Sequence, residues 1–100
     1  MISLLGVPLD ANSSHLVGPA LGPAAIRVAL HSGSGNHSSE ASVEVVDQLD
    51  DVGDVAIVNE RGSHADADAI TAAVAAQLDD GRQIITLGGD HSITFPILRA

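Results

Sequence analysis

The stretch I-I-T-L-G-G-D-H-S-I-T-F-P-I-L-R-A, at residues 84–100, is the most informative part of the chain for its fold. Its first four residues are aliphatic or β-branched, which predicts a strand over residues 84–87. Gly88 and Gly89 follow directly and allow the chain to turn sharply, and a new helix is expected to begin near Thr94. A strand, a glycine turn and a helix in this order are typical of an α/β fold.

Strand-like and helix-like segments also alternate along the rest of the chain. The expected strands are short apolar or β-branched runs: residues 2–7, 43–46, 55–58 and 84–87. The expected helices begin at Gly22-Pro23, cover residues 65–78, and begin again at Thr94. This β-α-β-β-α-β-α order predicts a parallel sheet with helices on its faces, and no internal domain boundary is expected within residues 1–100.

The first expected helix starts with a proline, at a position where no backbone N–H is needed. Ile26 and Leu30 lie one turn apart, so we expect both on its inner face, and Gly33 can end the helix. Residues 31–42 are rich in Ser, Gly, Asn and His, which predicts a loop.

The second expected helix has the clearest helical period in the chain. Ile70, Val74 and Leu78 recur every four residues, and we expect them to face the core. Ser63 is a suitable N-cap, and Gly81 suits the left-handed residue that follows a helix end.

Composition and charge exclude several classes of function. Thirteen acidic residues face four arginines and no lysine, for a formal net charge of −9, which rules out a basic groove for nucleic acid and attraction to anionic lipid. The absence of cysteine excludes disulfides, thiolate catalysis and zinc–thiolate sites. The first ten residues lack the pattern of a signal peptide, and the apolar run at residues 69–78 is too short to span a bilayer. We therefore expect a cytoplasmic protein without a membrane segment.

Asp90 and His91 follow the glycine turn, where a parallel α/β sheet places its ligands. A neutral imidazole there is suited to bind a metal, and the neighbouring carboxylate can orient the loop or the imidazole. Two alternatives remain open from the residues alone. The turn can be structural, with an incidental histidine, or its glycines can hold a small anion, although no Lys or Arg lies nearby in sequence.

Three motifs in order carry a resemblance to a known family. Residues 87–100, L-G-G-D-H-S-I-T-F-P-I-L-R-A, closely resemble the first metal-ligand motif of the ureohydrolases, the arginase and agmatinase family. G-V-P-L-D at residues 6–10, followed by G-P-A-L-G-P-A-A-I-R at residues 18–27, resembles the opening pattern of that family. D-V-G-D-V at residues 51–55 is similar to a third motif.

The resemblance implies a three-layer α/β/α fold around a parallel sheet, of which this chain is the N-terminal part. It also implies two Mn²⁺ ions that activate a bridging hydroxide, a small guanidino or amidino substrate, and a homo-oligomer, either a trimer or a hexamer. By the family pattern His91 is a ligand to one metal ion, while Asp90 supports the loop. The family's later Asp/His motifs are not in this sequence, so we expect an N-terminal fragment that is inactive alone.

The substrate is less well specified than the family. Agmatinase or arginase activity, which releases urea, is the first expectation, and hydrolysis of formimidoylglutamate is the next. N-S-S-H-L-V-G-P at residues 12–19 departs from the Arg-Pro-Gly-type stretch of many agmatinase-like members. A rival hypothesis from another class is a non-catalytic α/β module that binds a small anion at the glycine turn.

Other polar residues are expected to be structural. His64, Asp66 and Asp68 are residue types that often bind metals, but their spacing does not place them on one helix face. The helix dipole explains the acidic residues in the first turn. Three further histidines are expected to be solvated: His15, His31 and His37. Asp51 and Asp54 are expected to cap a turn before a strand. Arg27 is expected to pair with a carboxylate.

Overall fold

The computed structural model describes residues 2–14, 16–32 and 48–100. Within these ranges three parallel strands form one sheet in the order β2-β1-β3. The strands are β1 (Ile2–Val7), β2 (Leu49–Asp54) and β3 (Gln83–Gly88). The helices are α1 (Gly22–Leu30), α2 (His64–Asp79) and α3 (Thr94–Leu98), with short 3₁₀ turns at Pro19–Leu21 and His91–Ile93.

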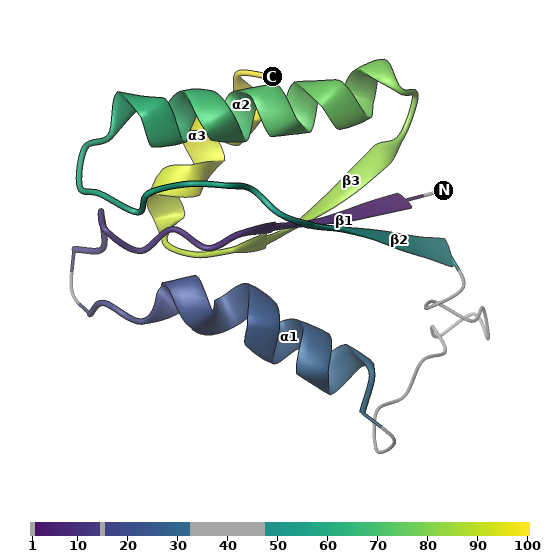
Figure 1. Ribbon diagram of the computed structural model, residues 1–100, viewed down its shortest axis with the longest axis horizontal. Helices are drawn as coiled ribbons and strands as arrows, with labels where there is room; N and C mark the ends of the chain where they lie inside the picture. The colour runs from purple at the N-terminus through teal and green to yellow at the C-terminus, as the bar shows by residue number, and fades with distance from the viewer. Residues whose placement is uncertain (1, 15, 33–47) are drawn as a thin grey trace.

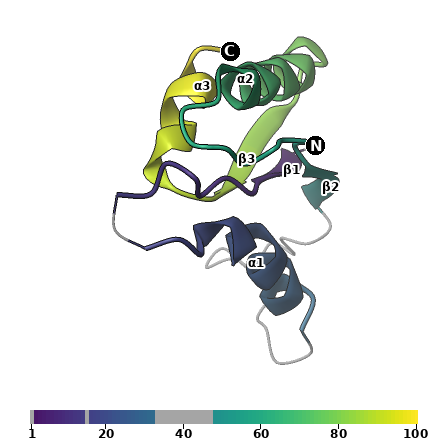
Figure 2. The same cartoon turned by 60° about the vertical axis from the view of Figure 1, so that its left-hand side comes forward.

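The helices cover both faces of the sheet. Figure 1 shows α1 on one side of the strands and α2 with α3 on the other, and the turned view in Figure 2 shows the same three layers. The described part of the chain therefore has the expected three-layer α/β/α architecture. None of its helices is long and apolar enough to cross a membrane.

Strand β1 lies in the middle of the sheet and is buried from Ser3 to Val7. A strand that is covered by helices on both faces needs apolar residues at successive positions, which is why its sequence is almost continuously apolar. Its expected bounds, residues 2–7, are confirmed. Because β1 pairs with both other strands, the carboxyl ends of all three strands meet at one edge of the sheet.

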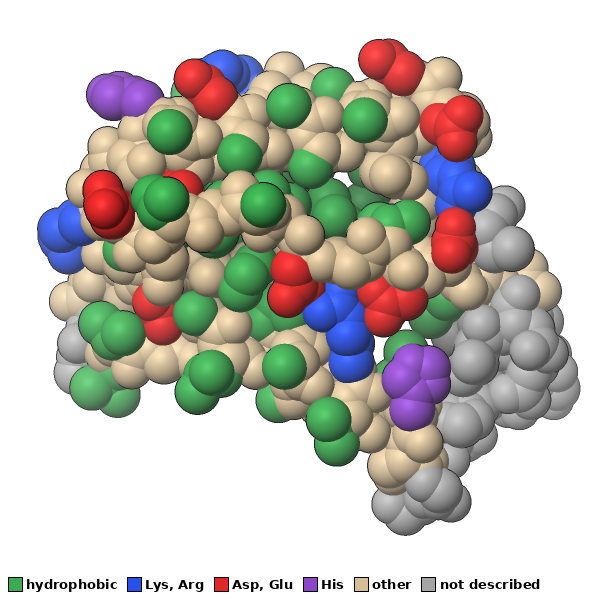
Figure 3. Space-filling model, in the orientation of Figure 1, with side chains coloured by type: hydrophobic (Ala, Val, Ile, Leu, Met, Phe, Trp, Pro, Cys, Tyr) green, Lys and Arg blue, Asp and Glu red, His purple; other side chains and the backbone are tan. Residues whose placement is uncertain are grey.

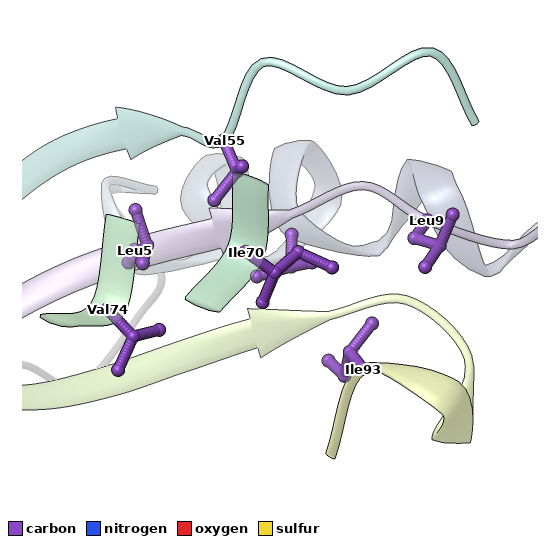
Figure 4. Close-up of a cluster of buried hydrophobic side chains, with 7 residues drawn as sticks. Leu5, Leu9, Val55, Ile70, Val74 and Ile93 are labelled. Atoms are coloured by element: carbon purple, nitrogen blue, oxygen red, sulfur yellow. The ribbon is translucent and has the colours of Figure 1, made fainter. Parts of the chain in front are cut away.

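The main core lies between the sheet and α2. Figure 4 shows side chains from β1, from α2 and from the segments that follow β1, β2 and β3 pointing toward one another. The buried members of this core are Leu5, Val7, Leu9, Val55, Ile70, Val74 and Ile93. Because Leu9, Val55 and Ile93 each lie just beyond a strand, the core also fixes the loops that leave the carboxyl edge.

Helix α2 begins and ends where the local signals predict. The Ser63 hydroxyl accepts the N–H of Asp66 at 3.1 Å, and Gly81 has a φ of +76° after the helix end. The expectation that Leu78 faces the core is wrong, because Leu78 is 47% exposed. A four-residue step turns about 40° past a full helical turn, so two steps from the buried Ile70 carry Leu78 off the inner face.

In α1 the expected inner face is also only partly right. Leu30 is half-buried, but Ile26 is 44% exposed. The neighbouring Arg27 takes the inward position, where its half-buried side chain pairs with carboxylates of β2. Exposed hydrophobic side chains therefore gather over α1 in the lower part of Figure 3.

The strand expected at residues 55–58 is wrong, because β2 is the acidic stretch that precedes it. The N–H of Val55 donates to the carbonyl of Gly6 at 2.8 Å, but the N–H of Val58 turns away to Asp66. Edge strands tolerate charged residues on their open side, which is why an acidic segment forms β2. The expected strand at residues 43–46 and the helix end at Gly33 lie outside the described residues.

Candidate metal centre

In the turn after β3, the backbone lies very close to the segment that leaves β1. Gly88 and Gly89 are joined by a cis peptide bond, and Gly89 has a φ of +88°. A Cβ atom on Gly89 would lie 2.6 Å from the carbonyl oxygen of Val7 and 2.7 Å from that of Leu9, which leaves no room for a side chain. The glycine turn therefore packs β3 directly against the segment that leaves β1.

Asp90 is buried, and both of its carboxylate oxygens accept hydrogen bonds from the protein. Oδ1 accepts the N–H and the hydroxyl of Ser92, and Oδ2 accepts the backbone N–H of Asn12 at 3.1 Å. The first contact caps the 3₁₀ turn His91–Ile93, and the second ties that turn to the loop after β1. These contacts agree with the expectation that Asp90 supports the loop.

His91 lies between Asp90 and Ser92, at the carboxyl end of β3 as the sequence predicts. Its side chain is exposed, and it lines a pocket of about 370 Å³ together with the loop after β1. The other lining residues are Asn12, Ser13, Ser14, Leu16, Pro19, Gly89, Asp90 and Ser92. The imidazole thus lies at a hollow on the edge where ligands bind in α/β sheets.

A second buried carboxylate, Asp10, holds the neighbouring loops together. Its Oδ1 accepts from Nδ2 of Asn59 at 2.9 Å, and Oδ1 of Asn59 accepts in turn from the backbone N–H groups of Asp10 and Ala11. Its Oδ2 accepts the N–H groups of Gly18 and Ala20. The hydrogen bond from Asn59 is the main cause that holds the pKa of Asp10 below its ordinary value, and burial opposes it.

Sequence reasoning missed Asn59 and gave Asp10 no role beyond its motif. Asn59 follows the apolar run at residues 55–58 and has a φ of +61°, a conformation that asparagine adopts more readily than most residues. An asparagine directly after such a run was therefore the available signal for a turn. Its partners lie some 49 positions away, so the contact itself had no signal in the sequence.

In the cluster His64, Asp66 and Asp68, both aspartates have partners within the protein. Asp66 is buried and accepts the N–H groups of Val58 and Glu60, and Asp68 pairs with Arg99 at 3.2 Å. Asp66 thus does more than interact favourably with the helix dipole, because it also anchors the loop that precedes α2.

The carboxylate partner expected for Arg27 is confirmed. Its Nε donates to Asp51 at 2.9 Å and its Nη1 donates to Asp54. The expected turn before a strand is wrong, because both aspartates lie in β2, although Asp51 does accept the N–H of Gly53. His31 is exposed, as expected, and His15 and His37 lie outside the described residues.

The described residues fit one part of a metal centre. His91 offers an exposed imidazole at the pocket, and the buried hydroxyl of Ser13, which lines the same pocket, has no hydrogen-bond partner among the described residues. Asp90 is less suited as a ligand, because both of its oxygens are already engaged. No group of three or more His, Asp or Glu within the described ranges could hold a metal ion, so a complete site needs ligands from elsewhere.

Comparison with known proteins identifies the family. The Arginase family model matches residues 1–100. Arginase 1, mitochondrial, from Oryza sativa subsp. indica is 43% identical over 97% of this chain and 31% of its own length. The solved arginase from Medicago truncatula superposes with a TM-score of 0.88 at 38% identity, over 99% of this chain and 33% of that one.

A hypothetical agmatinase from Burkholderia thailandensis is also similar, with a TM-score of 0.81 at 30% identity over 97% of this chain and 31% of its own. The chain thus spans about a third of the length of the relatives it matches. The likeness covers the whole described sheet and the turn that carries His91. The chain belongs to the arginase family.

Proposed function

We propose that the full-length protein hydrolyses a guanidino C–N bond of a small substrate and releases urea, with two Mn²⁺ ions, one of which His91 binds. The observation that carries this proposal is the exposed imidazole of His91 beside a pocket at the carboxyl edge of the sheet. Family membership supplies the class of reaction. Two divalent ions lower the pKa of bound water, so that a hydroxide is available near neutral pH.

The residues of this chain have a limited part in that reaction. His91 presents its imidazole, and the carboxylate of Asp90 holds the turn on which His91 lies. Both oxygens of Asp90 accept hydrogen bonds from Ser92 and Asn12, so this carboxylate serves to hold the turn. The remaining ligands and the groups that recognise the substrate's tail are expected in the part of the relatives' length that this chain does not span.

Arginine is the substrate that we propose first. The relatives at 43% and 38% identity are named arginases, whereas the hypothetical agmatinase from Burkholderia thailandensis is 30% identical. The sequence N-S-S-H-L-V-G-P at residues 12–19 also departs from the Arg-Pro-Gly-type stretch of many agmatinase-like members. Agmatine and formimidoylglutamate are therefore comparison substrates in the test.

The hydrogen bonds of the glycine turn weigh against the rival hypothesis of an anion-binding module. The N–H of Gly89 donates to the carbonyl of Pro19, and the N–H of Asp90 donates to that of Leu9. The N–H of Ser92 is engaged by Asp90. An anion-binding turn needs free N–H groups that point at the ligand, and these three point at the protein.

The test uses the purified full-length protein, loaded with Mn²⁺, and measures urea release from arginine and from agmatine. Loss of formimidoylglutamate is followed in parallel. Turnover of arginine above the metal-only blank supports the proposal, and turnover of formimidoylglutamate alone replaces it with that activity. The homo-oligomer, trimer or hexamer, and the cytoplasmic location stay predictions, which light scattering and cell fractionation would test.

A further inference from the structure

The side chain of Asn12 connects the loops that leave all three strands. Asn12 itself lies in the loop after β1, and its Oδ1 accepts the N–H of Gly62, in the loop after β2, at 2.7 Å. Its Nδ2 donates to the hydroxyl oxygen of Ser92, directly after His91, at 3.1 Å. One amide group therefore bridges segments that are 50 and 80 positions away in the chain.

These contacts continue into the carboxylate that precedes His91. The hydroxyl of Ser92 accepts from Asn12 and donates its proton to Oδ1 of Asp90, and the backbone N–H of Asn12 donates to Oδ2 of the same carboxylate. Asn12 therefore contacts the residue on each side of His91. His91 thus lies between two residues that Asn12 contacts, Asp90 and Ser92.

We propose that Asn12 is a positioning residue that fixes the imidazole of His91 for metal binding. The inference rests on the proposed role of His91 as a metal ligand. It concerns Asn12, which has no part in the proposed function. The chemistry of the position favours an amide, because one end must accept from Gly62 and the other must donate to Ser92. Groups that orient a metal ligand typically change metal affinity by about 10–100-fold when they are removed.

The decisive variant is Asn12→Asp, which keeps the shape and the acceptor facing Gly62 but replaces the donor facing Ser92 with an oxygen. The Ser92 proton is already given to Asp90, so two acceptors then face each other beside a buried carboxylate. The full-length protein is stripped of metal and titrated with Mn²⁺, and free Mn²⁺ is measured by its electron paramagnetic resonance signal. We expect one of the two ions to bind about 10–100-fold more weakly.

The matched control is Ser63→Ala, which removes the N-cap of α2 in a neighbouring loop without touching the turn of His91. A lost N-cap lowers the stability of the protein, so thermal unfolding of the metal-free proteins reports general damage in both variants. We expect Ser63→Ala to bind both ions as the wild type does. If Asn12→Asp loses no more Mn²⁺ affinity than Ser63→Ala, the positioning role is overturned.

Ser92→Ala provides a second route if Asn12→Asp does not fold, because it removes the acceptor of the Asn12 amide and leaves the contact with Gly62 in place. It should weaken the same ion, and wild-type affinity in this variant would overturn the inference. His91→Ala separates the two proposals. If His91→Ala weakens one ion while Asn12→Asp and Ser92→Ala do not, only the role of Asn12 fails; if His91→Ala binds both ions normally, the proposed metal role of His91 fails as well.

Discussion

Two segments of this chain combine histidine with aspartate, and the structure uses them differently. In the first, at the start of α2, His64 precedes the buried Asp66; in the second, after β3, His91 follows the buried Asp90. Both aspartates accept backbone N–H groups, and both histidines are exposed. The difference lies in what surrounds each imidazole.

His64 begins a helix whose first turn lines a groove beside α3, and Asn12 and Ser92 also line this groove. His91 instead lies at the carboxyl edge of the sheet, in a pocket formed with the loop after β1. In both segments the buried aspartate near the histidine is an acceptor for backbone N–H groups. The place of the histidine in the topology, and not its neighbour, makes it a candidate ligand.

The largest expected effect is the difference between removing the imidazole of His91 and removing that of His64. In the full-length protein, His91→Ala should reduce the Mn²⁺ content from two ions toward one per subunit and lower turnover by at least about 10–100-fold, since a direct ligand matters at least as much as an outer one. His64→Ala is the matched control and should keep the wild-type Mn²⁺ content and turnover. Elemental analysis of the purified proteins measures the metal content, and equal loss in both variants would remove the distinction.

The next effect sharpens the comparison within the first segment. Asp66→Ala leaves the N–H groups of Val58 and Glu60 without their buried acceptor, and we expect it to lower the free energy of unfolding by about 2 kcal/mol. Asp68→Ala removes only an exposed pair with Arg99 and should cost less than about 1 kcal/mol. Urea denaturation of both full-length variants gives the two values, and equal losses would contradict the anchoring role of Asp66.

A smaller effect concerns pH at the carboxyl edge. The folded pKa of Asp10 lies below the unfolded value near 3.8, so its contribution to stability is complete above that value and is lost as pH falls through the folded pKa. Asn59→Ala removes the main cause of the lowered pKa. The unfolding midpoint of this variant should therefore fall less between pH 6 and pH 3 than that of the wild type. An unchanged pH dependence would contradict the role of Asn59.

The smallest effect compares the two ends of α2. Asp66 and Asp68 lie near the end where the helix dipole favours negative charge, whereas Asp79 is the last helical residue, where the dipole disfavours it. Asp79→Asn should raise the free energy of unfolding by about 0.3–1 kcal/mol at low salt. The gain should shrink in 1 M KCl, where the screening length is about 3 Å. A gain that is independent of salt would point away from electrostatics.

The parts of the fold that were predictable have local causes. β1 needed only its continuous apolar run, and α2 needed the cap at Ser63 and the glycine at position 81. β2 was misplaced because its stability depends on distant partners. It pairs with β1, and its acidic side chains pair with Arg27 and Arg82, which a local propensity does not register.

The same division holds for the candidate site. His91 was identifiable as a candidate because a strand, two glycines, an aspartate and the histidine follow one another in sequence, and because residues 87–100 resemble the metal-ligand motif of a known family. Asn12 and Asn59 were not, because each acts on loops that only the folded sheet brings together. The candidate metal ligand was therefore predictable from the sequence, and the side chains that connect the surrounding loops were not.

The metal role of His91 is tested most directly by a crystal structure of the full-length protein grown with Mn²⁺, with anomalous diffraction recorded to locate the ions. We predict an anomalous peak within bonding distance of a ring nitrogen of His91, with Asp90 still held by Asn12 and Ser92 and no peak at His64. Two Mn²⁺ peaks that are both beyond bonding distance of His91 would contradict it.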